Sequence, residues 1–151
     1  MVYGRMIQRT AMERKKAILR FLDGRLIKGF VDNVSQSDKV VSIEDESSRR
    51  HNVDMKELKG IFFVKTFGGD KRRKEKKAFR GTRQTGQRVF VRFKDGESMI
   101  GHIEGDIPWR KGFFLGPKKS TGFFLKPVDS ESNNIKIFVV ATSIDDMTTI
   151  G

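Results

Sequence analysis

The residues with the clearest capacity for chemistry are the basic ones between residues 71 and 83, where eight Lys or Arg stand against one acidic residue. The densest part comprises Lys71, Arg72, Arg73, Lys74, Lys76 and Lys77. Such side chains bind phosphates, with an affinity that comes from counterion release and weakens as salt rises. Two alternatives stay open. So dense a run of like charge also suits a solvated linker, and similar clusters bind anionic membrane surfaces.

A second candidate site surrounds the only tryptophan. Trp109, Arg110 and Lys111 are consecutive, and Lys118 and Lys119 lie between two Gly-Phe-Phe-Leu runs. A base can stack on an indole ring while cations hold the backbone, which is how single-stranded nucleic acid is bound. The two runs, ten residues apart, predict an extended hairpin over residues 105–127 with lysines at its tip. The alternative is that Trp109 and the phenylalanines fill a core shared between two halves of the chain.

No pattern predicts catalysis. The two histidines, His51 and His102, lack the partner spacing of a metal site. We find no Gly-rich phosphate loop, nucleophile elbow or paired-carboxylate motif. The sequence therefore predicts a protein that is not an enzyme and needs no metal or cofactor. His102 aligns with Phe30 in the repeat described next, and we expect it on the outward face or between the halves.

The sequence contains an internal repeat, and its two copies predict the strands that must position these residues. The stretch from Arg20 to Val31 returns from Arg92 to Ile103, with Arg, Phe, Asp and two Gly at a constant offset of 72. Each copy starts with an apolar strand and turns at Asp-Gly, a strong hairpin signal. Gly29 and Gly101 fall inside the next strand, where glycine marks a bend or a close backbone approach.

The ends of the two copies align at a larger offset, 86, which matches Val53 with Val139 and Leu58 with Ile144. About fourteen extra residues therefore lie between Ile103 and Val139. The fold class predicted is mainly β, with two tandem five-stranded small barrels, because a bent second strand lets a short sheet close. The alternative is two flat hairpins in a larger sheet.

Residues Asp23-Gly24-Arg25, Gly29 and Leu58-Lys59-Gly60 carry a resemblance to the SH3-like and Sm-like small barrels. The sequence departs from the Sm pattern at the RNA pocket, where Ser35 to Lys39 stand, so no RNA-pocket residues are carried over. The repeated layout over roughly residues 17 to 150 resembles an uncharacterised bacterial family of tandem small barrels of unknown function.

The predicted organisation has four parts. They are a basic leader over residues 1–16, a first barrel over 17–69, a basic linker over 70–84 and a second barrel over 85–151 that carries the inserted hairpin. The leader is either a short helix capped by Thr10 or a frayed tail. Barrels this small are marginal alone, so we expect them to share an interface.

Charge and composition limit the cellular compartments in which the protein is expected. The net charge is +12, and most of the excess lies in the leader and the linker. The chain has no cysteine, which excludes a disulfide framework. No apolar run approaches the roughly 20 residues of a membrane span, and the N-terminus lacks a signal-peptide core. These features predict a soluble cytoplasmic protein.

The function predicted is non-enzymatic binding of nucleic acid, either RNA or single strands, with weak sequence preference. The alternative is an adaptor for protein partners or for a second messenger, as in PilZ domains. Asn33-Val34-Ser35 matches half of one PilZ motif, but Asp38 stands where a glycine is expected. The ligand, any protein partner and the oligomeric state stay open.

Overall fold

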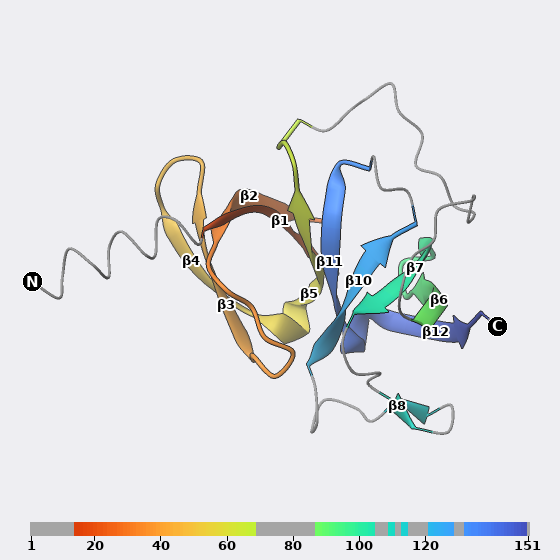
Figure 1. The fold of residues 1–151 in the computed structure, drawn as a ribbon. Helices are drawn as coiled ribbons and strands as arrows, with labels where there is room; N and C mark the ends of the chain where they lie inside the picture. The colour runs from red at the N-terminus through yellow and green to blue at the C-terminus, as the bar shows by residue number, and fades with distance from the viewer. Residues whose placement is uncertain are drawn as a thin grey trace, which may run out of the picture.

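The structure, a computed structural model, describes residues 14–68, 87–104, 109–110, 113–114, 121–128 and 132–150. Among these residues ten antiparallel strands form one open sheet, and two further strands pair by themselves (Figure 1). The prediction of a mainly β protein is confirmed. The main strands are β1 (Lys15–Phe21), β2 (Leu26–Val31), β3 (Val40–Asp45), β4 (Arg50–Asp54), β5 (Leu58–Val64), β6 (Gln87–Phe93), β7 (Ser98–Glu104), β10 (Gly122–Pro127), β11 (Asn134–Val140) and β12 (Ile144–Thr149).

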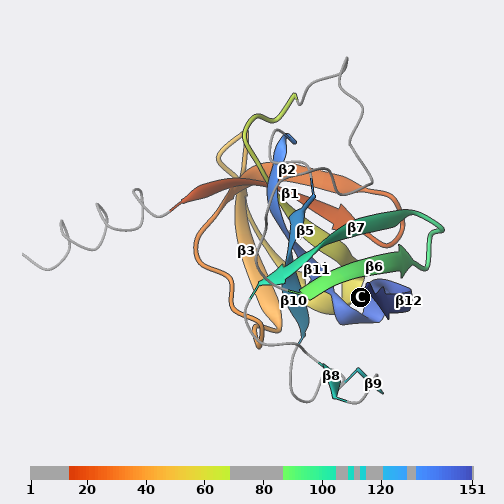
Figure 2. The same ribbon diagram turned by 45° about the vertical axis from the view of Figure 1, so that its right-hand side comes forward.

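The two halves of the sheet have the same strand order. The sheet runs β12-β6-β7-β10-β11-β5-β1-β2-β3-β4, so each half places its fifth strand beside its first and its fourth at the far end. The registers match as well: Leu19 faces Ile27 as Val91 faces Met99. Single-turn 3-10 helices, η1 (Met55–Glu57) and η2 (Ala141–Ser143), precede the fifth strands. Figure 2 shows the β6–β7 hairpin with β12 in the turned view.

Both Asp-Gly hairpins form as predicted, and in equivalent surroundings. Gly24 and Gly96 adopt positive φ angles of 93° and 92°. Such angles strain residues that carry a Cβ but not glycine. In each turn the aspartate carboxylate accepts a hydrogen bond from the backbone N–H two residues later, 3.0 Å from Arg25 and 2.9 Å from Glu97.

Gly29 and Gly101 lie where neighbouring backbone leaves no room for a side chain. A Cβ on Gly29 would collide with the carbonyl oxygen of Glu44 in β3, and one on Gly101 with that of Lys126 in β10. The close approach predicted for these two glycines is therefore confirmed. It lets the second strand of each half bend tightly against the third.

The two halves are joined rather than separate, because β5 pairs with β11 along its length. Every residue of β5 is buried, since its two faces belong to different cores. Ile61 and Phe63 point into a first core with β1 to β4, whereas Phe62 and Val64 point into a second core with β6, β7, β10 and β11. Among the described residues β4 does not pair with β5, nor β11 with β12, so the sheet is open. Figure 1 shows β1 to β4 curling round the first core.

Two local expectations differ from the structure. Strand β1 begins at Lys15, inside the segment assigned to the basic leader, because Lys15 and Lys16 pair with β2. The two Phe-Phe runs do not pair with each other. Phe113–Phe114 forms β9 and pairs with β8 (Trp109–Arg110), whereas β10 pairs with β7 and β11. The second run lies in β10, which takes a place between β7 and β11 as β3 does between β2 and β4, so it belongs to the main sheet.

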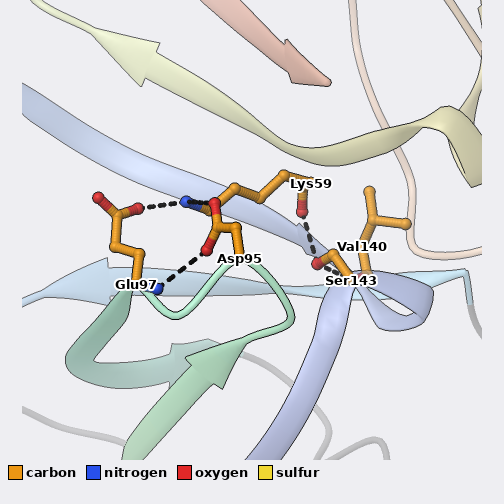
Figure 3. A network of polar contacts seen from close by, with 5 residues as sticks. All are labelled: Lys59, Asp95, Glu97, Val140 and Ser143. Atoms are coloured by element: carbon orange, nitrogen blue, oxygen red, sulfur yellow. Dashed lines mark hydrogen bonds and ion pairs between the residues drawn. The ribbon is translucent and has the colours of Figure 1, made fainter. Parts of the chain in front are cut away.

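A buried lysine fastens the halves at one end of the junction. Lys59 of β5 is 5% exposed, and its ammonium group binds the carboxylates of Asp95, at 2.8 Å, and Glu97 (Figure 3). It also lies 4.7 Å from the centre of the Phe93 ring. The Ser143 hydroxyl is 2.9 Å from the Lys59 carbonyl oxygen and 2.6 Å from that of Val140. These bonds tie the first half to the β6–β7 turn and to η2.

Candidate anion-binding groove

A groove of about 500 Å³ lies at one end of four adjacent strands, β10, β11, β5 and β1. Five lysines line it together with three apolar residues, and none of the described residues in its lining is acidic. We call it the lysine groove, and its residues are Lys15, Lys16, Phe63, Val64, Lys65, Lys126, Ile135 and Lys136. It spans the junction, since β1 and β5 come from one half and β10 and β11 from the other.

Antiparallel pairing explains why these lysines meet. Each stands near an end of its strand, and antiparallel neighbours place the start of one strand beside the end of the next. The register pairs Ala17 with Phe63, and Phe63 with Lys136, which brings the start of β1 and the start of β11 to the end of β5. Strand β10 ends beside the start of β11 in the same way.

The groove combines charge with apolar surface, and buried or partly buried aromatic rings lie beside one of its lysines. The ammonium group of Lys136 lies 5.4 Å from the ring centre of Phe63 and 4.7 Å from that of Phe124. Ile135 is 52% exposed, one of the few large apolar side chains left open to solvent among the described residues. A cation above a ring gains from the quadrupole of that ring. The groove can therefore contact both an anionic group and a flat apolar one.

The electrostatics of the groove favour an anionic ligand. Five like charges around one opening repel one another, and the repulsion is relieved when an anion binds between them. Several acidic residues elsewhere are paired with bases. At the β3–β4 turn Glu44 contacts Arg14 at 3.0 Å, and a hydrogen bond from His51, at 2.8 Å, is the main cause that lowers the pKa of Asp45.

A buried histidine lies beside the groove. His102 of β7 is directly opposite Lys126 of β10 on one side and Arg88 of β6 on the other. It is 2% exposed, which corrects the expectation of an outward position. Burial is the main cause that lowers its pKa from the ordinary value of 6.5, and the charge of Arg88 adds to the effect. His102 is therefore neutral at neutral pH, and it contributes no positive charge there.

Most of the residues predicted from the sequence as a nucleic-acid site lie outside the described residues. They are Lys71, Arg72, Arg73, Lys74, Lys76, Lys77, Lys111, Lys118 and Lys119. Trp109 and Arg110 are described only through the backbone of β8.

The lysine groove is not apparent from the sequence alone. Lys15 and Lys16 lie in the segment predicted to be a basic leader, and the other three lysines are isolated in the sequence. The available signal was a lysine at or beside the end of an apolar strand, as in Val64-Lys65 and Leu125-Lys126. That signal gains meaning only once the strand order is known, because the order brings the two halves together.

The loop with the partial PilZ match is closed by its own hydrogen bonds. The Asp38 carboxylate accepts from the backbone N–H of Ser35, at 2.9 Å, and from its hydroxyl, at 2.9 Å. Asp38 thus has a structural role at the position where the motif has glycine.

The His, Asp and Glu side chains of the described residues form no group of three or more that could hold a metal ion. Within the same residues no helix has the length and apolar character needed to cross a membrane.

Comparison with known proteins gives a family but no activity. No curated protein and no solved structure matches the chain significantly. A family model matches residues 13–151, which includes every described strand. The chain belongs to this family, described as a family of unknown function (DUF6982).

Proposed function

We propose that the protein is a non-enzymatic binding module for nucleic acid, RNA or single-stranded DNA, with weak sequence preference. The lysine groove holds the phosphates, and the basic run over residues 71–77 adds further phosphate contacts. This run begins six positions after Lys65 in the sequence, so the two can act on one strand.

The observation that supports this function best is the convergence of five lysines from four strands on one groove. The groove draws on both halves of the sheet, and the described residues of its lining include five lysines and no acidic residue. A charged surface that serves only solubility needs no such convergence. Binding of phosphates gives this arrangement a physical purpose, since release of counterions from the nucleic acid supplies the free energy.

The apolar part of the groove favours nucleic acid over a simple polyanion. Bases stack on aromatic and apolar side chains while cations follow the backbone. Ile135, which is 52% exposed, provides such a contact between the lysines. The described lining has no Asn, Gln or Arg side chain, the types that read base edges through paired hydrogen bonds, which agrees with weak sequence preference.

We also propose that the two halves are tandem copies of one SH3-like or Sm-like five-stranded unit. The equal strand order, the matched registers and the two Asp-Gly turns support this interpretation. In this view the lysine groove is a product of the duplication, because it forms where the fifth strand of the first copy pairs with the fourth strand of the second copy.

The test is binding of labelled single-stranded RNA and DNA, followed by fluorescence anisotropy. The variant Lys65→Gln/Lys136→Gln removes two groove charges, and we expect it to weaken binding about tenfold. The control Arg49→Gln/Lys94→Gln removes two exposed charges outside the groove and should change the affinity by less than about twofold.

Two results would contradict the proposal. One is an equal loss in both double variants, which would mean that only net charge matters. The other is heparin binding as tightly as the nucleic acids do, since that would remove any contribution from the bases.

A further inference from the structure

A second cavity, of about 610 Å³, lies at the opposite ends of β10 and β11 from the lysine groove. We call it the threonine cavity. Its lining consists of Lys39, Val40, Asp54, Met55, Lys56, Thr121, Val140 and Thr142. A volume of this size suits a small organic ligand.

Both halves of the sheet build this cavity from equivalent positions. Val40 and Gly122 begin equivalent strands, so Lys39 corresponds to Thr121. The 3-10 turns give a second match, Lys56 with Thr142. One half thus contributes two ammonium groups and the other two hydroxyls, and the cavity exists only where the halves meet.

The two threonines are not accounted for by the fold. The hydroxyl oxygens of Thr121 and Thr142 are shielded from solvent, and neither has a hydrogen-bond partner. Thr121 is 6% exposed. A buried hydroxyl without a partner is costly, and native proteins seldom keep one without a reason. Rotation of a threonine by 120° about χ1 moves its hydroxyl to the staggered position that the methyl group or the hydrogen held, so each hydroxyl has another rotamer in which to meet a ligand in the cavity.

The backbone around the threonines holds the cavity open in a fixed shape. The Thr121 N–H donates to the carbonyl of Gln36 at 2.7 Å, and the Ala141 N–H donates to the carbonyl of Thr121 at 2.9 Å. The Asp54 carboxylate accepts from the backbone N–H of Lys56 at 2.9 Å. Asp54 is thereby the cap of η1, and Lys39 and Lys56 are both exposed residues.

We infer that the threonine cavity binds a single nucleotide. Val40, which is 54% exposed, offers apolar surface to a flat base, and the buried Met55 and Val140 lie behind it. The hydroxyls can donate to and accept from the edge of the base, and Lys39 and Lys56 attract its phosphate. The nucleotide can be a free mononucleotide or one unit of a strand. This inference does not depend on the lysine groove, which lies at the other ends of the same strands.

The experiment titrates the full-length protein with nucleoside monophosphates, with the matching nucleosides and with inorganic phosphate, by isothermal calorimetry. We expect the monophosphates to bind more tightly than either simpler compound. Thr121→Val/Thr142→Val keeps the side-chain shape and removes both hydroxyls, and should weaken binding at least about tenfold. Thr148→Val, on exposed β12, is the control and should change nothing.

Further variants separate this site from the lysine groove. Lys39→Gln/Lys56→Gln should abolish the preference for monophosphate over nucleoside, whereas Lys65→Gln/Lys136→Gln should leave mononucleotide binding unchanged. Binding of a strand without binding of free monophosphates, if the threonine variant weakens it, assigns the cavity to one unit of the strand. The inference is overturned if inorganic phosphate binds as tightly as the monophosphates, or if the threonine variant binds every probe as the wild type does.

Discussion

The Nζ atom of Lys59 lies 2.8 Å from Oδ2 of Asp95, so that a buried ammonium group in one half of the sheet meets a turn of the other. The partners of this contact differ in their exposure to solvent. The Lys59 side chain is 6% exposed, whereas those of Asp95 and Glu97 are close to half exposed. Loss of the lysine therefore leaves two carboxylates that water can solvate, but loss of the carboxylates leaves a buried charge without compensation.

This asymmetry predicts which partner can be removed at lower cost. We expect Asp95→Asn/Glu97→Gln to lower the free energy of unfolding by about 3 kcal/mol, and Lys59→Met by about 1 kcal/mol. Urea unfolding at neutral pH measures both. Asp23→Asn, in the equivalent turn of the first half, is the control because its partner Arg25 is exposed. A double variant no less stable than Asp23→Asn would contradict the account.

The same contact predicts a loss of stability in acid. A hydrogen bond from Lys59 is the main cause that lowers the pKa of Asp95 below its ordinary 3.8. A carboxyl whose pKa is lower in the folded state contributes stability above its unfolded pKa and loses it as pH falls through the folded value. The stability difference between wild type and Asp95→Asn should therefore be constant above about pH 5 and shrink below pH 3.8. A difference that persists unchanged in acid would show that the charge is not involved.

His102 predicts a second dependence, at milder pH. Its pKa is lowered by burial, so between 6.5 and its folded pKa the unfolded chain binds a proton that the folded chain does not. Stability should fall as pH decreases through this window, and His102→Gln should flatten the curve. Thermal unfolding measured across this pH window tests the prediction. Equal slopes of stability against pH in the wild type and in His102→Gln would refute the assignment of the effect to His102.

Gly29 predicts a large effect from a single methyl group. A Cβ there meets the backbone of Glu44 and Asp45, which cannot move without breaking the β2–β3 pairing. We expect Gly29→Ala to cost about 3 kcal/mol of unfolding free energy, as severe overpacking does. Gly68→Ala is the matched control, since nothing lies within 4 Å of its Cβ position. Equal stability of the two variants would mean that the strands can separate at Gly29.

The sequence predicted the local geometry of each half because the signals there are local. Asp-Gly dipeptides fix hairpins, and glycines inside strands mark close backbone contacts, whatever surrounds them. The spacing of the strands also differs between the halves in the region where the extra residues were predicted. Ile103 and Gly122 are nineteen positions apart where Val31 and Val40 are nine apart, and the rest lie between β10 and β11.

The junction between the two halves of the sheet could not be predicted from the sequence in the same way. The pairing of β5 with β11 joins residues far apart in the chain, and the apolar run from Ile61 to Val64 would serve equally in a barrel closed on itself. The predicted pairing of the two Phe-Phe runs was wrong because both runs have the pattern of a strand. Only the second run pairs with strands of the main sheet. Both candidate sites lie across the junction, so the sequence pointed to the basic runs but not to either cavity.

The salt dependence of single-stranded RNA binding tests the central claim most directly. The logarithm of the affinity should fall linearly with the logarithm of the salt concentration, with a slope of about 0.7 for each phosphate that a lysine neutralises. A variant with Gln at Lys15, Lys16, Lys65, Lys126 and Lys136 should lose up to about 3.5 units of that slope. Loss of the slope in this variant, with the control Arg49→Gln/Lys94→Gln unchanged, is the result the proposed function predicts, and a slope equal to that of the wild type would contradict it.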